Sequence, residues 1–261
     1  MAFQYLGEIT GGLAPVIKLQ VAANCYQGQL LKYDQDAGGS VEPVADAGDL
    51  PEDVTVLAGI CLGLGRNTTP GTSFYNATYK GDLITYDSST QSDLLLNDPP
   101  GPALAAVQII TPNSLIWAPI VKDTVGTAPE CKAVTTGSSN GLTFVTATVD
   151  TTVSQFSTVY CRTGANRGQY RKVTTGNATT QTVLIAFQNT IAVGDTFCIA
   201  NVVQGFAHIN FDTQFQGIDS SDALTTGYTV IVHELNLEEA GKEYCTFRFA
   251  PQHFDDHAIP T

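Results

Sequence analysis

Residues 137–149 read Gly-Ser-Ser-Asn-Gly-Leu-Thr-Phe-Val-Thr-Ala-Thr-Val, a turn-forming run followed by an alternation of apolar and polar residues. Glycine, serine and asparagine supply the backbone conformations and local hydrogen bonds that turns require. A period of two places successive side chains on opposite faces of a strand. The stretch therefore predicts a hairpin loop that leads into a β-strand over residues 142–149.

The same change from apolar alternation to turn residues recurs along most of the 261-residue chain. Short strands at such spacing are typical of sandwiches and barrels. The further strands that we predict span residues 29–33, 54–62, 83–86, 105–110, 115–121, 158–162, 169–173, 182–187, 196–203, 228–234 and 244–249. Residues 237–242 are expected to form a loop between the last two of these strands. The sequence predicts an all-β fold of β-sandwich or β-barrel domains with little helix.

The run around Ser139 also satisfies Gly-x-Ser-x-Gly, the nucleophile elbow of α/β hydrolases. That elbow requires a helix directly after the serine, so that the hydroxyl is exposed on a sharp turn. Here a β-branched alternation follows instead. We therefore assign no catalytic role to Ser139 and expect the chain not to be an enzyme.

The charge balance bears on the class of partner. The formal net charge is −13, and only 14% of the residues are charged. Phosphate binding needs clustered lysine and arginine, so the composition argues against nucleic acid. The sequence has neither a membrane-length apolar run nor an N-terminal signal peptide, and we expect synthesis in the cytoplasm without membrane association.

Six cysteines are widely separated and form no Cys-x-x-Cys pair, so we expect them to be reduced and mostly buried in strands. We predict no cofactor and no metal ligands. Near the C-terminus, His253, Asp255, Asp256 and His257 bring together metal-binding side chains, and whether they bind a metal stays open.

Three prolines within residues 98–102 deny backbone donors and stiffen the chain, which favours a domain junction. The organisation that we predict has five parts. They are an extended N-terminal arm over 1–25, a β domain over 26–98, the proline-rich junction at 99–102, a second β domain over 103–205, and C-terminal strands with a tail over 206–261.

Two stretches carry a resemblance to a known class of protein. Residues 28–34 read Gly-Gln-Leu-Leu-Lys-Tyr-Asp, and Gly-Ser-Val-Glu-Pro-Val at 39–44 and Leu-Ala-Gly-Ile-Cys-Leu at 57–62 follow. This series resembles head decoration, or capsid cement, proteins of tailed bacteriophages. A second stretch, residues 158–173, contains Gly-Ala-Asn-Arg-Gly-Gln-Tyr-Arg-Lys-Val at 164–173 and is similar to a hairpin of phage virion proteins.

The resemblance implies a structural virion protein that binds the outer surface of the capsid and stabilises it without catalysis. Its expected partners are the major capsid protein and further copies of itself, with a trimer favoured. The contact residues that we predict lie in the N-terminal arm and in the hairpin at 158–173, which we call the basic hairpin because of its arginines and lysine. They are Phe3, Tyr5, Leu6, Arg167 and Arg171.

Two alternatives remain. A phage tail or fibre component would be expected to show a long shaft repeat or an aromatic binding groove. A carbohydrate-binding or carbohydrate-degrading β protein would be expected to stack sugars on aromatic side chains, but the only tryptophan, Trp117, lies in an apolar strand.

Overall fold

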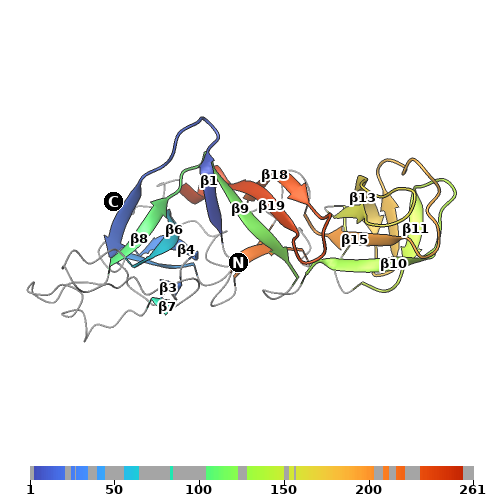
Figure 1. The fold of residues 1–261 in the computed structure, drawn as a ribbon, viewed down its shortest axis with the longest axis horizontal. Helices are drawn as coiled ribbons and strands as arrows, with labels where there is room; N and C mark the ends of the chain where they lie inside the picture. The colour runs from blue at the N-terminus through green and yellow to red at the C-terminus, as the bar shows by residue number, and fades with distance from the viewer. Residues whose placement is uncertain are drawn as a thin grey trace, which may run out of the picture. The chain divides into compact units, whose positions relative to one another are not determined.

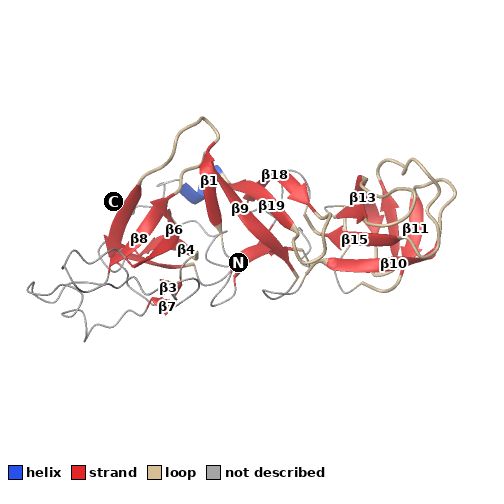
Figure 2. Cartoon of the chain, viewed as in Figure 1, coloured by secondary structure: helices blue, strands red, loops and turns tan. Residues whose placement is uncertain are grey.

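The computed structural model describes most of the chain and divides it into two compact units. The described residues are 3–20, 25–26, 28–34, 40–44, 56–64, 83–84, 104–122, 128–149, 153–155, 157–202, 208–211, 216–220 and 230–254. Unit 1 comprises Met1–Trp117, Phe211–Gln216 and Phe249–Thr261, and unit 2 comprises Ala118–Asn210 and Gly217–Arg248. The regular secondary structure of the described part is strand except for one short 3₁₀ helix at Pro251–Phe254 (Figure 2), which confirms the predicted all-β class.

The main sheet of unit 1 has five strands in the order β2-β8-β6-β4-β5. Their bounds are β2 Val16–Gln20, β4 Leu30–Asp34, β5 Ser40–Pro43, β6 Leu57–Leu64 and β8 Leu104–Ile109. Figure 1 labels three of them, β4, β6 and β8. A separate two-stranded sheet pairs β3 (Cys25–Tyr26) with β7 (Leu83–Ile84). Small and branched residues fill the core of this unit: Cys25, Leu31, Val41, Ala58, Cys61, Ala105 and Val107.

The first 20 residues differ from the predicted arm wherever the structure describes them. β1 (Gln4–Glu8) pairs antiparallel with the first half of β9 (Ser114–Val121), and β2 pairs with β8 along its whole length, from Val16 to Gln20. Leu19 packs against the core of unit 1. The segment has few charges, which suits strands that are held by their neighbours as well as it suits an extended arm. The predicted proline-rich junction at 99–102 lies outside the described residues.

Unit 2 contains a closed six-stranded barrel in the order β10-β11-β14-β13-β12-β15. The strands are β10 Glu130–Thr136, β11 Thr143–Thr146, β12 Thr158–Cys161, β13 Tyr170–Gly176, β14 Thr180–Val183 and β15 Thr196–Ala200. All the pairings are antiparallel. Closure satisfies the backbone groups that an open sheet leaves at its edges.

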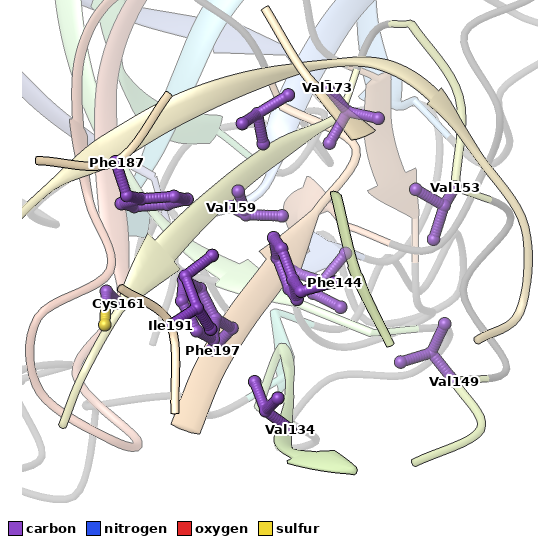
Figure 3. Close-up of a cluster of buried hydrophobic side chains, with 12 residues drawn as sticks. Val134, Phe144, Val149, Val153, Val159, Cys161, Val173, Phe187, Ile191 and Phe197 are labelled. Carbon is purple, nitrogen blue, oxygen red and sulfur yellow. The ribbon is translucent and has the colours of Figure 1, made fainter. Parts of the chain in front are cut away.

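Three phenylalanines form the centre of the barrel core (Figure 3). The rings of Phe144 and Phe197 stack with their centroids 4.5 Å apart, and Phe187 meets Phe197 edge-on at 5.2 Å. Val134, Val159, Val173 and other aliphatic side chains surround these rings. The inward residues of β11 and β15 alternate with outward ones, as the sequence pattern predicts.

Unit 2 also contains the last strands of the chain, β18 (Val230–Asn236) and β19 (Tyr244–Phe249), except that Phe249 belongs to unit 1. They belong to a sheet ordered β16-β17-β9-β19-β18, with β16 at His208–Phe211 and β17 at Gln216–Asp219. β17 pairs with β9 in parallel. The segment between β18 and β19 is a turn-containing loop, as predicted, and it packs against the barrel of the same unit.

Candidate functional site

A row of four side chains crosses the outer face of the barrel. Cys131 of β10 lies opposite Cys198 of β15, Cys198 lies opposite Tyr160 of β12, and Tyr160 lies opposite Tyr170 of β13. The neighbours of Cys198 in sequence, Phe197 and Ile199, belong to the barrel core. Because side chains alternate along a strand, the row points away from that core.

The loop between β18 and β19 covers this row. The backbone N–H of Leu237 donates to the Tyr170 hydroxyl over 2.9 Å, and the Arg162 Nε donates to the Leu237 carbonyl over 3.0 Å. Arg162 also pairs with the carboxylate of Glu243, whose side chain is only 1% exposed. Burial raises the pKa of Tyr170 to about 12. The covered row is thus a polar layer between the barrel and the loop.

A cluster of metal-binding atoms lies at one end of the covered row. The Sγ atoms of Cys131 and Cys198 and a carboxylate oxygen of Glu243 all lie within 4.8 Å of one another. A hydrogen bond with Cys198 and the charge of Arg162 lower the pKa of the Cys131 thiol, although burial opposes them. The same hydrogen bond, with burial, raises the pKa of Cys198 well above its usual value.

The predicted placement of the cysteines is confirmed. Each of the six lies in a strand, none forms a disulfide, and all but the half-buried Cys131 are buried. Cys25 and Cys61 form a second close pair, in unit 1, with their Sγ atoms 3.8 Å apart.

The basic hairpin forms as predicted, between β12 and β13, but its cations differ in their surroundings. Arg167 is exposed. Arg171 is half-buried, donates to the carbonyls of Ala186 and Tyr170, and lies 5.0 Å from the ring centroid of Phe187. Arg171 is thus bound within its own unit, and Arg167 is the one of these two predicted contact residues that faces solvent.

The three predicted contact residues near the N-terminus also differ in their surroundings. Phe3 is buried and meets the ring of Phe249 edge-on within unit 1. The Tyr5 hydroxyl accepts from the backbone N–H of Ala14 over 2.7 Å and donates to Glu8 over 3.0 Å. Leu6 is 49% exposed. Phe3 and Tyr5 therefore support the surface on which Leu6 is displayed.

Exposed apolar side chains concentrate around that surface. Of the ten large hydrophobic residues that are exposed in the described part of the chain, five fall within residues 6–17, which we call the apolar turn. They are Leu6, Ile9, Leu13, Val16 and Ile17, with Leu13 80% exposed.

Hydrogen bonds fix the shape of the apolar turn. The Gly11 N–H donates to the Glu8 carbonyl over 2.9 Å, and the side-chain amide of Gln108 donates to the Ala14 carbonyl over 3.0 Å. The Glu8 carboxylate accepts from Thr111 and Ser114 as well as from Tyr5. The turn therefore presents its apolar side chains from a fixed backbone.

A second exposed apolar set lies on the barrel: Leu142, Leu184, Ile185 and Val193. Leu142 and Leu184 flank strands that pair with one another, because the Val183 N–H donates to the Leu142 carbonyl over 3.0 Å. We call these four residues the barrel apolar set.

The remaining predicted sites are less informative. The run around Ser139 connects β10 to β11, so the hairpin-loop prediction is confirmed, and the Ser138 hydroxyl donates to Asn140 over 2.7 Å. His253 is buried in the 3₁₀ helix, whereas Asp255, Asp256 and His257 lie outside the described residues. Among the residues that the structure describes, no helix is long and apolar enough to cross a membrane.

Sequence reasoning missed the Cys131, Cys198 and Glu243 cluster. Its members are far apart in the chain, and they meet because β10 pairs with β15 and a loop folds over both. The available signal was a strand at 130–136, whose pairing with 196–200 would have placed the two thiols opposite one another. We found no match for the chain among models of protein families, curated proteins or solved structures.

Proposed function

We propose that this chain is a structural virion protein that binds the outer surface of a tailed-phage capsid and stabilises the shell. The two stretches that resemble phage virion proteins support the proposal. Both form antiparallel hairpins, β4 with β5 and β12 with β13. The resemblance itself implies the virion, the outer shell surface and self-association, with a trimer favoured.

The observation that carries the proposal is the apolar turn. Single exposed hydrophobic residues are normal on soluble proteins, but five of them within twelve residues of chain favour a surface that contacts another molecule. Here Leu6, Ile9 and Leu13 are exposed on a backbone that hydrogen bonds hold in place. A fixed apolar surface loses little entropy on binding, which suits a permanent contact.

The proposed mechanism is mechanical. A protein that spans neighbouring capsid subunits adds buried area to joints that internal DNA pressure would otherwise open. The strongly acidic remainder of the surface, with a net charge of −13, stays in solvent or faces basic groups of the shell. In this arrangement Leu6 and Arg167 belong to the contact, while Phe3, Tyr5 and Arg171 hold the contact surfaces in shape.

Co-sedimentation with capsids tests binding. Purified protein is mixed with heads that lack it, the heads are pelleted, and the bound copies are counted per capsid. We expect saturation at a fixed stoichiometry that matches the capsid symmetry. Leu13→Ser combined with Ile9→Ser should weaken binding, while Val193→Ser, an exposed change in the barrel apolar set, should not.

Three outcomes contradict the proposal. The first is a failure of the wild-type protein to pellet with heads. The second is binding that rises without saturation. The third is specific binding to tails or to glycans in place of heads, which would favour the tail or carbohydrate alternatives. Circular dichroism of each variant shows whether a loss of binding reflects a loss of fold.

A further inference from the structure

Three side chains of types that bind transition metals meet at one end of the covered row. Cys131 and Cys198 are directly opposite on antiparallel strands, so their side chains lie on the same face of the sheet. Glu243 reaches the same point from the loop between β18 and β19. From these positions we infer that Cys131, Cys198 and Glu243 form a Zn²⁺ site that fastens this loop to the barrel.

The donor set fits zinc in chemistry and in size. Zinc accepts thiolate and carboxylate ligands in a tetrahedral arrangement, with Zn–S near 2.3 Å and Zn–O near 2.0–2.2 Å. Such a tetrahedron places its ligand atoms about 3.5–3.8 Å apart. The three ligand atoms already lie within 4.8 Å of one another, so side-chain movements of about 1 Å bring them to the distances of a zinc tetrahedron. A fourth position remains for water.

The surrounding charge also fits. Two thiolates and one carboxylate exceed the charge of Zn²⁺ by one, and the guanidinium of Arg162 on Glu243 balances the excess. Arg162 in addition donates to the carbonyl of Leu237, which fixes its direction. A hydrogen-bonding partner of this kind orients a ligating carboxylate and raises the metal affinity without itself binding the metal.

The second close thiol pair, in unit 1, provides a contrast. Cys25 and Cys61 are as close as metal-binding thiols, with Sγ atoms 3.8 Å apart. Metal-binding groups of three or more within the described residues were found only at Cys131, Cys198 and Glu243. Cys25→Ser therefore serves as a matched control for the loss of one thiol of a close pair.

Cobalt substitution of the whole chain under reducing conditions tests the site. Co²⁺ bound by two thiolates gives a thiolate-to-metal charge-transfer band in the near ultraviolet, and tetrahedral geometry intensifies its visible bands. We expect the wild-type protein to take up one Co²⁺ per chain with both signals, and to exchange it for Zn²⁺. Cys131→Ser should lose the charge-transfer band at a metal concentration that saturates the wild type, and Cys25→Ser should keep it.

An independent measurement covers the case in which Cys131→Ser does not fold. Alkylation of the folded wild type, mapped by peptide mass, should modify the half-buried Cys131 in metal-free protein and spare it when Zn²⁺ is added. The inference is overturned if the wild type shows no thiolate–cobalt band, if Cys131→Ser keeps the band, if Cys25→Ser abolishes it while folded, or if Zn²⁺ leaves the alkylation of Cys131 unchanged.

Discussion

The guanidinium of Arg162, at the end of β12, is paired with the carboxylate of Glu243, just before β19. The side chains are 12% and 1% exposed, so both charges are largely removed from water. Because Arg162 also donates to the Leu237 carbonyl, one side chain ties both ends of the β18–β19 loop to the barrel. The pair joins parts of unit 2 that lie far apart in the sequence.

Removing one partner of this pair should destabilise unit 2 strongly. Arg162→Met leaves the Glu243 charge buried without its partner, and changes of this kind cost about 3–5 kcal/mol. Replacing both members, as Arg162→Met with Glu243→Leu, should recover much of the loss because no charge is then buried. Unfolding in urea measures both variants.

A nearby exposed pair provides the control for that prediction. Lys242 and Glu239 lie 2.7 Å apart but are 69% and 66% exposed, so water already solvates both charges. Lys242→Ala should leave the unfolding midpoint almost unchanged. Equal losses of unfolding free energy in Arg162→Met and Lys242→Ala would contradict the prediction that the buried pair contributes more stability than the exposed one.

The barrel core should be sensitive to a loss of volume at Phe144. This ring is 1% exposed and stacks on Phe197. Phe144→Ala opens a cavity between three aromatic rings and should cost about 3–5 kcal/mol. Leu184→Ala, at a residue 59% exposed, should change the free energy of unfolding by less than about 0.5 kcal/mol. Calorimetry on the two variants makes the comparison, and similar melting temperatures would contradict the core assignment.

Two glycines of the β12–β13 hairpin allow backbone strain to be separated from crowding. Gly164 and Gly168 have φ values of +87° and +89°, where other residues are strained. A Cβ on Gly168 meets nothing within 4 Å, whereas one on Gly164 would lie 2.0 Å from Asp195 Oδ1.

Alanine at these two positions should therefore have unequal effects. Gly168→Ala should cost about 1–2 kcal/mol from strain alone. Gly164→Ala should lose a further ~1–3 kcal/mol, because Asp195 has to move. Urea midpoints for the two variants test this order, and a larger loss at Gly168 would refute it.

Stability should fall in acid through Glu8. Burial raises the pKa of this carboxyl, but hydrogen bonds from Ser114, Thr111 and Tyr5 outweigh burial and hold it below its usual 4.5. A lowered folded pKa contributes stability that is complete above pH 4.5 and is lost as the pH falls through the folded value. Wild type should thus exceed Glu8→Gln in stability near neutral pH, and the difference should shrink below pH 4.5. A difference that stays constant through this acid range would contradict the role of the carboxylate.

How much the sequence predicts depends on whether the alternation of a strand is clean. β19 was predicted at 244–249, which are its observed bounds. β10 was missed because Glu130 and Lys132 interrupt its pattern on the side that carries Val134. The structure tolerates these charges because Lys132 lies 3.1 Å from the Glu130 carboxylate and Lys122 lies 3.5 Å from it. The Lys132 contact is local to β10, but the Lys122 contact depends on which segments become neighbours, which no local pattern reveals.

The candidate sites divide in a similar way. The β12–β13 hairpin and the loop at Ser139 follow from turn residues beside predicted strands, so the sequence alone predicted them. The β4–β5 pairing was not predicted, because β5 is not among the strands that the sequence pattern indicated. The burial of Phe3 and the cover over Cys198 depend on which strands become neighbours. The parallel pairing of β17 with β9 is of the same kind, because it joins segments distant in the chain.

The central claim is that this protein braces a shell, and the stability of DNA-filled heads tests it most directly. Heads lacking the protein are heated with and without saturating amounts of it, while a dye reports the release of packaged DNA. We predict that the release temperature rises with occupancy and levels off when the binding sites are full, and that the variant with Leu13→Ser and Ile9→Ser fails to raise it. Bound protein that leaves the release temperature unchanged would contradict the account.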